Sequence, residues 1–166
     1  MRIGIFADTH DHMDNIRLAV EYFNRAECEY VLFAGDLVST FVIPPLRKLN
    51  CPMIACFGDN EGNKPGIYAG FSIIGTIAEA PLCIRLPDGT RILMSHMRQQ
   101  MQGMHGEYDL LIFGHTHKPV VKLEESGRMQ VNPGETSGWT YGRSTIAMLE
   151  TESMSAEIID LVKPHD

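Results

Sequence analysis

The strongest constraint in this sequence is a set of five short apolar segments, each of which runs directly into Asp or His side chains. The segments cover residues 2–7, 30–34, 53–57, 91–95 and 110–113. Apolar runs of this length that stop at a polar loop are typical of strands buried on both faces of a sheet. Because ligand sites in α/β sheets lie beyond the carboxyl ends of strands, we expect the side chains that follow to converge. They are Asp8 and His10, Asp36, Asp59, His96, and His115 with His117.

The stretches around these segments predict the fold class. Apolar side chains recur at helical spacing over 15–25, and a shorter helix is predicted over 41–49, with two prolines near its start. Strands that alternate with helices predict a parallel sheet with right-handed crossovers. Later strands are predicted in pairs, at 82–86 with 91–95, 120–123 with 129–131, and 144–149 with 156–161. We therefore expect an α/β fold in which two mixed sheets face each other and helices cover them.

Composition limits the domain organisation and the class of ligand. With 166 residues, of which 44% are hydrophobic, the chain is expected to form one domain over residues 1–166. Its net charge of −7 disfavours nucleic acid as a partner, because nucleic-acid binders attract phosphate with clustered basic side chains. A phosphate ligand would instead need a local positive charge, and a bound metal ion is the obvious source.

The first apolar run stops at Asp8 and is too short for a signal-peptide core or a membrane span. We therefore expect a cytoplasmic, soluble protein with no membrane partner. The four cysteines, at positions 28, 51, 56 and 83, lack CxxC spacing, so free buried thiols are predicted rather than a disulfide or a zinc site.

The residue types at the segment ends form a metal-ligand set. Three carboxylates and four imidazoles suit divalent Mn, Fe, Co or Zn, and seven side chains exceed what one structural zinc ion needs. They suffice for two ions that share one carboxylate and leave positions open to water. Two ions about 3.5–4 Å apart can hold a hydroxide and clamp phosphoryl oxygens during in-line displacement. Each motif alone also fits an ordinary strand-end turn or loop histidine, so the prediction depends on their repetition.

The signature blocks of the calcineurin-like metallophosphoesterases resemble five stretches of this sequence. These are Asp8-x-His10, Gly35-Asp36, Gly58-Asp59-Asn60-Glu61, His96 and Gly114-His115-Thr116-His117. The short chain and the run Val131-Asn132-Pro133-Gly134-Glu135 resemble the small bacterial and archaeal phosphodiesterase branch of that superfamily.

The resemblance implies an α/β/β/α sandwich with a dimetal site at one edge. One ion would take as ligands Asp8, His10, Asp36 and His117. The other would take Asp36 as the bridge, the third-block residue, His96 and His115. Two manganese ions are what this branch implies, with nickel, iron, cobalt and zinc left open.

Two positions depart from the family pattern. The third block usually has a neutral Asn ligand where this chain has Asp59, so either Asp59 or the following Asn60 is the expected ligand. With Asp59, three carboxylates, two divalent ions and a hydroxide sum to zero charge, which suggests a preference for singly charged diesters over dianionic monoesters. Asn60 also stands where many members carry a His that protonates the leaving group, a transfer typically worth about 10²–10⁴-fold in rate. We therefore expect slow turnover or good leaving groups, unless His12 or His105 takes that role.

The predicted function is hydrolysis of a phosphodiester bond in a small phosphate-ester substrate by metal-activated hydroxide. The residues expected to carry the chemistry are Asp36, Asp59 and His96. The alternatives are an interaction scaffold of the same fold, like the retromer subunit that resembles these enzymes, and a metal-dependent nuclease.

Several other residues have two interpretations. Candidates to hold the substrate phosphate, or else exposed surface cations, are Lys64, Arg98 and Arg143. The four methionines in residues 94–104 have helical spacing and favour core packing, with a substrate lid or a homodimer contact as alternatives. Trp139 favours core packing at least as strongly as a position lining the site or an oligomer contact.

Overall fold

The computed structural model describes residues 1–104 and 106–161, and within them the chain forms two sheets and three α-helices. The helices are α1 (Met13–Arg25), α2 (Ile43–Leu46) and α3 (Lys64–Phe71), with two 3₁₀ turns, η1 (Thr40–Val42) and η2 (Arg98–Met101). His12 is the N-cap of α1, and its Nδ1 accepts a hydrogen bond from the Asn15 N–H.

The first sheet has the strand order β11-β10-β1-β2-β3-β4. Strands β1 to β4 pair in parallel, while β10 lies antiparallel to both β1 and β11. The strands span β1 (Arg2–Phe6), β2 (Tyr30–Ala34), β3 (Met53–Cys56), β4 (Gly75–Ala78), β10 (Thr145–Glu150) and β11 (Ser155–Asp160).

The second sheet has the order β5-β6-β7-β9-β8, in which β6, β7 and β9 are parallel and the two outer strands are antiparallel. Its strands span β5 (Leu82–Arg85), β6 (Arg91–Met94), β7 (Leu110–Ile112), β8 (Val120–Leu123) and β9 (Met129–Asn132). Both sheets are therefore mixed, as predicted.

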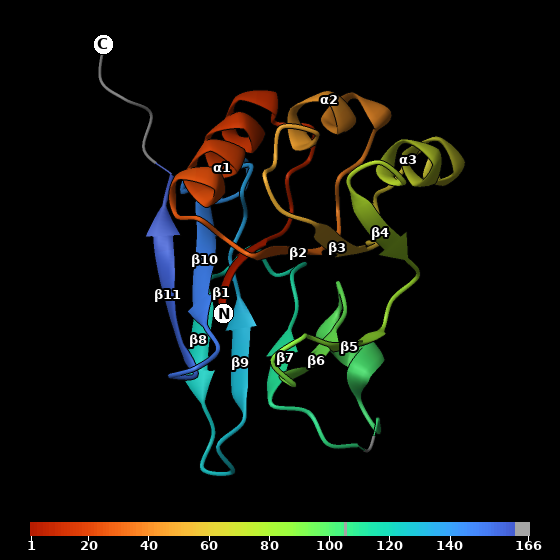
Figure 1. Cartoon of the computed structure of the whole chain (residues 1–166). Helices are drawn as coiled ribbons and strands as arrows, with labels where there is room; N and C mark the ends of the chain where they lie inside the picture. Colours follow the sequence, from red (N-terminus) through yellow and green to blue (C-terminus); the bar gives the residue numbers. More distant parts are fainter. Residues whose placement is uncertain (105, 162–166) are drawn as a thin grey trace.

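The central strands are buried on both faces, and their side chains divide between two cores. In β2, Val31 and Phe33 pack toward the helices, whereas Leu32 and Ala34 pack between the sheets. Figure 1 shows the three α-helices on one side of the first sheet and the second sheet on the other. The far face of the second sheet carries η2, where Met101 packs with Leu93. The predicted fold class is confirmed.

Several local predictions were incomplete or wrong. Helix α3 and strand β4 were not predicted, because two glycines and a proline weaken the helical signal in residues 64–71 and β4 has only four residues. The helical spacing over residues 94–104 does not correspond to a helix. Met94 ends β6 and packs between the sheets, and Met101 ends the short η2 turn.

The four cysteines are free thiols, as predicted, but the prediction that all of them are buried was wrong. Cys28 and Cys56 are buried, Cys51 is half-buried, and Cys83 is exposed. Burial raises the pKa of the Cys28 thiol to about 12 and also raises the pKa of Cys56. Among the described residues, no helix is both long enough and apolar enough to cross a membrane.

Because the thiolate is the reactive form, we expect an aromatic disulfide reagent at pH 8 to modify Cys83 first in the native protein. Cys28 and Cys56 should react more slowly by at least about 100-fold, and in denaturant all four thiols should react rapidly. Absorbance of the released thiol measures both phases. Cys83→Ser should abolish the fast phase, and a fast phase that survives this substitution would contradict the burial described here.

Candidate metal centre

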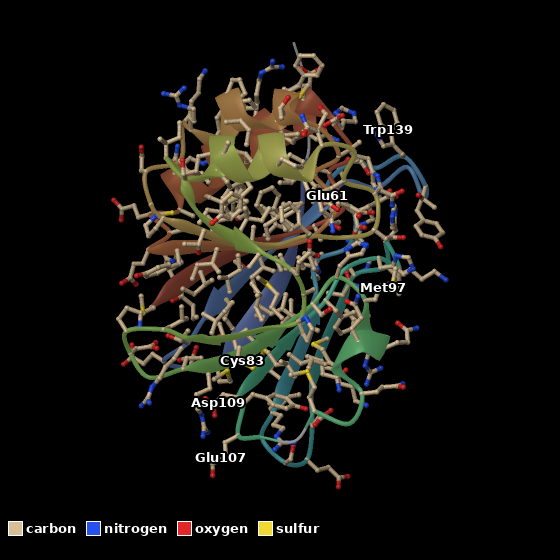
Figure 2. The ribbon with its side chains drawn as sticks, turned by 90° about the vertical axis from the view of Figure 1, so that its right-hand side faces the viewer. Glu61, Cys83, Met97, Glu107, Asp109 and Trp139 are labelled. Atoms are coloured by element: carbon tan, nitrogen blue, oxygen red, sulfur yellow. The ribbon has the colours of Figure 1, made fainter. Side chains whose placement is uncertain are left out.

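The predicted ligands lie together at one edge of the molecule, in loops that follow five strands. Strands β1, β2 and β3 of the first sheet lead into the carboxylate-bearing loops, and β6 and β7 of the second sheet lead into His96 and the His115–His117 segment. In Figure 2, Glu61, Met97 and Trp139 mark this part of the molecule, well above Cys83 and Glu107. Three groups of side chains have ligand atoms within 4.8 Å of one another.

The first group consists of Asp8, His10 and His117. The Nε2 atoms of His10 and His117 lie 3.4 Å apart. Asp8 Oδ1 lies 3.3 Å from His117 Nε2 and 3.9 Å from His10 Nε2. Three ligand atoms therefore surround one point between β1 and the loop after β7.

The second group consists of Asp59, His96 and His115. Asp59 Oδ1 lies 2.9 Å from His96 Nε2 and 3.4 Å from His115 Nδ1. Asn60 is placed differently, since its side-chain amide donates a 2.7 Å hydrogen bond to Asp36 Oδ2. Of Asp59 and Asn60, the two candidates of the third block, Asp59 is the one whose side chain faces the histidines.

Asp36 lies between these two groups, and with Asp8 and His96 it forms the third group. Its Oδ2 is 3.5 Å from His10 Nε2 and 3.4 Å from His96 Nε2. Its Oδ1 accepts hydrogen bonds of 3.0 Å from the backbone N–H groups of Asp59 and Asn60. One carboxylate thus faces both groups and also fixes the loop after β3.

Two buried ligand atoms have no hydrogen-bond partner among the described residues, Asp8 Oδ1 and His96 Nε2. His96 Nε2 is close to three carboxylates, but none of these contacts has hydrogen-bond geometry. Leaving a buried polar atom without a partner costs about 1–3 kcal/mol. Metal ligands direct their lone pairs at a common point, where the ion binds, and not at hydrogen-bond donors of the protein. These residues are therefore suited to bind a cation.

The backbone at the ligands adopts an unfavourable conformation. Non-glycine residues avoid positive φ angles, at a cost of about 1–2 kcal/mol each. Such strain is concentrated at functional sites, where the surrounding structure over-determines it. The ligands with positive φ are Asp8 (53°), His10 (40°), Asp36 (68°), His115 (65°) and His117 (60°).

The glycines of the Gly-Asp motifs make room for other ligands. A Cβ atom on Gly58 would lie 2.1 Å from Asp36 Oδ1, and one on Gly35 would lie 2.6 Å from the His96 ring. Gly35 also has a φ of +94°, which side chains rarely tolerate. These glycines are therefore required, because each borders a ligand that follows a different strand.

The charges of the centre shift the pKa values of its members. Burial acts to lower the pKa of His96, but the nearby carboxylates of Asp36 and Asp8 raise it to about 9. The Asp8 carboxylate, with Glu135 on the far side of the ring, likewise raises the pKa of His117 to about 9. Burial acts to raise the pKa of Asp36, but the adjacent His96 ring and the hydrogen bonds from Asn60 bring it well below its usual range. The carboxylates thus create a negative potential that favours positive charge at this position.

The rear nitrogens of two rings are held by protein acceptors. His96 Nδ1 donates to the Ala34 carbonyl at 2.8 Å, and His117 Nδ1 donates to Glu135 Oε2 at 2.9 Å. Each bond leaves Nε2 directed toward the centre. This arrangement is typical of metal-bound histidines, whose outer hydrogen bonds fix the tautomer and ring orientation.

Glu135 is a functional candidate that sequence reasoning quoted only as part of a family-like run. Its carboxylate is 1% exposed, and it accepts hydrogen bonds from the Thr140 and Tyr141 N–H groups and from the Ser137 hydroxyl. Burial acts to raise the pKa of Glu135, but these backbone bonds and His117 lower it. The only feature of the sequence that could have indicated its role is its position directly after an Asn-Pro-Gly turn.

The other predicted residues lie outside the two groups. Lys64 pairs with Glu79, Arg143 pairs with Asp160, and Arg98 stacks over Phe113, so each has a local partner. His12 caps α1 and stacks against Trp139. His105 lies outside the described residues. Of the interpretations of Trp139, core packing was wrong, because its side chain is 65% exposed.

Comparisons with known proteins agree with the blocks found in the sequence. The model of the calcineurin-like phosphoesterase superfamily domain matches residues 1–154. A phosphodiesterase of Methanocaldococcus jannaschii is 37% identical over 158 residues, which cover 92% of this chain and 94% of that protein. A probable metallophosphoesterase of Methanothermobacter thermautotrophicus is 30% identical over 168 residues, covering 96% of this chain and 92% of that protein. A solved structure described as a novel archaeal phosphodiesterase has a TM-score of 0.89 at 36% identity, covering 97% of this chain and 100% of that chain.

The contact between Glu135 and His117 generates a prediction about metal affinity. Glu135→Gln should lower the affinity for Mn²⁺ about 10- to 100-fold, because a neutral amide orients the ring less firmly and withdraws a negative charge. Calorimetric titration of the metal-free protein measures this directly. Glu152→Gln, at an exposed position, is the matched control and should bind as the parent protein does. If Glu135→Gln retains its fold and its full affinity, the orienting role is wrong.

Proposed function

Because this chain belongs to the calcineurin-like phosphoesterase superfamily, and is therefore a phosphoesterase, we propose that it hydrolyses phosphodiester bonds of a small substrate with two divalent ions. The observation that supports this most strongly is the placement of Asp36 between two groups of Asp and His ligands. One carboxylate shared by two sites is the arrangement expected of a dinuclear centre. Manganese is the ion proposed here, with nickel, iron, cobalt and zinc as alternatives.

The chain's own residues divide into two ligand sets. The first would consist of Asp8, His10, His117 and the shared Asp36, and the second of Asp59, His96, His115 and the same Asp36. When bound, divalent ions supply Lewis-acid activation of water and neutralisation of phosphoryl oxygens. The protein fixes the ligands in advance, through strained loops and the outer bonds of His96 and His117.

The net charge of the centre favours diesters over monoesters. With Asp59 as a ligand, three carboxylates offset all but one of the four positive charges of two divalent ions. The Glu135 carboxylate, which the sequence-based charge count omitted, adds negative charge behind His117. Both kinds of ester are therefore attracted less strongly here than at a centre with a neutral third-block ligand. The loss of attraction is smaller for a singly charged diester than for a dianionic monoester.

Asn60 leaves the centre without the family's usual proton donor. Its amide is already hydrogen-bonded to Asp36 and cannot act as an acid near neutral pH. His12 is held as a helix cap and stacks on Trp139, which leaves it at the rim. Substrates with good leaving groups are therefore the class that this site suits.

Reconstitution of the metal-free protein tests the proposal. We expect two Mn²⁺ ions per chain and hydrolysis of bis(p-nitrophenyl) phosphate, with Asp36→Asn lowering turnover by at least about 100-fold. Metal analysis and release of nitrophenolate measure the two quantities. Asp14→Asn, at an exposed position of α1, is the control for removing a carboxylate and should retain activity. Protein that binds two ions and leaves the diester intact would exclude the proposed reaction.

Asp59→Asn restores the family's neutral side chain and so tests whether the charge of Asp59 sets the substrate preference. We expect the ratio of diester to monoester kcat/KM to fall by roughly 10-fold, because the centre gains one positive charge and attracts dianions more strongly. Parallel assays with bis(p-nitrophenyl) phosphate and p-nitrophenyl phosphate give the ratio. An unchanged ratio, with metal content preserved, would show that Asp59 does not set the preference.

A further inference from the structure

Two large aromatic side chains are exposed beside the metal centre. Trp139 is 65% exposed and Tyr141 is 55% exposed, and both belong to the loop between β9 and β10. Figure 2 shows Trp139 at the same edge of the molecule as Met97, which directly follows His96. An exposed aromatic ring at the rim of a candidate site gives a ligand a rigid apolar surface to cover.

The loop is fixed to the ligands rather than free. The indole Nε1 of Trp139 donates a 3.3 Å hydrogen bond to the His10 carbonyl, and its ring lies 4.6 Å from the His12 ring at an angle of 34°. The Thr140 hydroxyl lies 2.8 Å from His117 Nδ1. The Trp139 ring therefore has a defined place next to two ligand residues, with most of its surface open to solvent.

Glu135 anchors the same loop from inside. It accepts the backbone N–H groups of Thr140 and Tyr141 while it also accepts from His117. Lys118 lies above the Tyr141 ring, with its Nζ 5.5 Å from the ring centroid, and so places a cation beside Tyr141 in the same loop. An indole held next to the ligands, with a cation on the same loop, matches a ligand that carries both a planar ring and a phosphate.

We propose that Trp139, supported by Tyr141, is a specificity-determining platform that stacks a planar aromatic group of the phosphodiester substrate. This inference rests on the proposed diester hydrolysis and names its substrate class. The planar group is either a nucleobase or the aromatic ring of an aryl ester. Stacking of a base on an aromatic side chain contributes enough to change affinity about 5- to 30-fold.

Direct binding tests the platform without requiring turnover. Trp139 is the one tryptophan in the sequence, so its fluorescence reports on this face alone. Adenosine 5′-methylphosphonate should quench the emission of the metal-loaded protein in a saturable way, whereas methyl methylphosphonate, which has the same charge and no ring, should not. Quenching without diester hydrolysis would mean that the platform holds and the proposed reaction fails.

Kinetics then distinguish the two kinds of ring. Thymidine 5′-(p-nitrophenyl) phosphate and methyl p-nitrophenyl phosphate share a leaving group and differ in the other ester. If a nucleobase stacks, Trp139→Ala should raise KM about 5- to 30-fold for the thymidine ester only, and if the nitrophenyl ring stacks, KM should rise for both esters. In either case kcat and Mn²⁺ affinity should stay within about 2-fold, and Trp139→Phe should restore most of the KM.

Tyr68→Ala is the matched control, because Tyr68 is 62% exposed and lies near Gly75 and Thr76, at the opposite end of β4 from the ligand loops. It should change neither KM. The proposal is wrong if Trp139→Ala leaves both KM values unchanged, or if kcat and metal affinity fall with them as a purely structural role would require. Should the alanine variant not fold, the fluorescence titration of the parent protein decides, and absence of quenching overturns the platform.

Discussion

The carboxylate of Asp36 holds the centre together. One oxygen accepts the N–H groups of Asp59 and Asn60, which fixes the loop after β3, and the other faces histidines from both ligand groups. Position 58 must be glycine, because any side chain there would overlap the Asp36 carboxylate. Without this carboxylate the two groups would lose the member they share, and the loop that carries Asp59 would lose its attachment.

The two sheets make this convergence possible. Both contain parallel strands whose carboxyl ends face the same edge, so loops from β1, β2 and β3 meet loops from β6 and β7. The strained backbone at five of the ligands is tolerated because the strands before them are buried between apolar layers on both faces. At about 25 cal/mol per Å² of buried apolar surface, such layers readily offset a few kcal/mol of local strain. The ligands are therefore placed before any ion arrives, which lowers the cost of binding one.

Features that depend on a single strand could be predicted from the sequence. Features that depend on contacts between distant residues could not. Apolar runs ending in Asp or His identified the strands and the family, because strand burial and strand-end loops are local properties. Helix α3 escaped, since Pro65, Gly66 and Gly70 oppose helix formation locally and packing of Ile67 and Phe71 outweighs them. The contact of Glu135 with His117 joins two loops from different strands, and no periodicity encodes it. Exposure of Trp139 was likewise undecided, because an indole suits a core and a ligand site equally well.

Glu135 connects two properties that are usually separate, ion binding and the shape of the substrate face. Its carboxylate orients His117 and at the same time holds the N–H groups of Thr140 and Tyr141, so the loop that carries Trp139 is built onto a metal ligand. An aromatic loop without such an anchor would gain free energy by folding its rings against the nearest apolar surface. Here the buried charge can be satisfied only when the loop keeps its present course, since releasing it would leave an anion without donors at a cost of several kcal/mol. The exposed rings and the ordered histidine are therefore two consequences of one buried carboxylate.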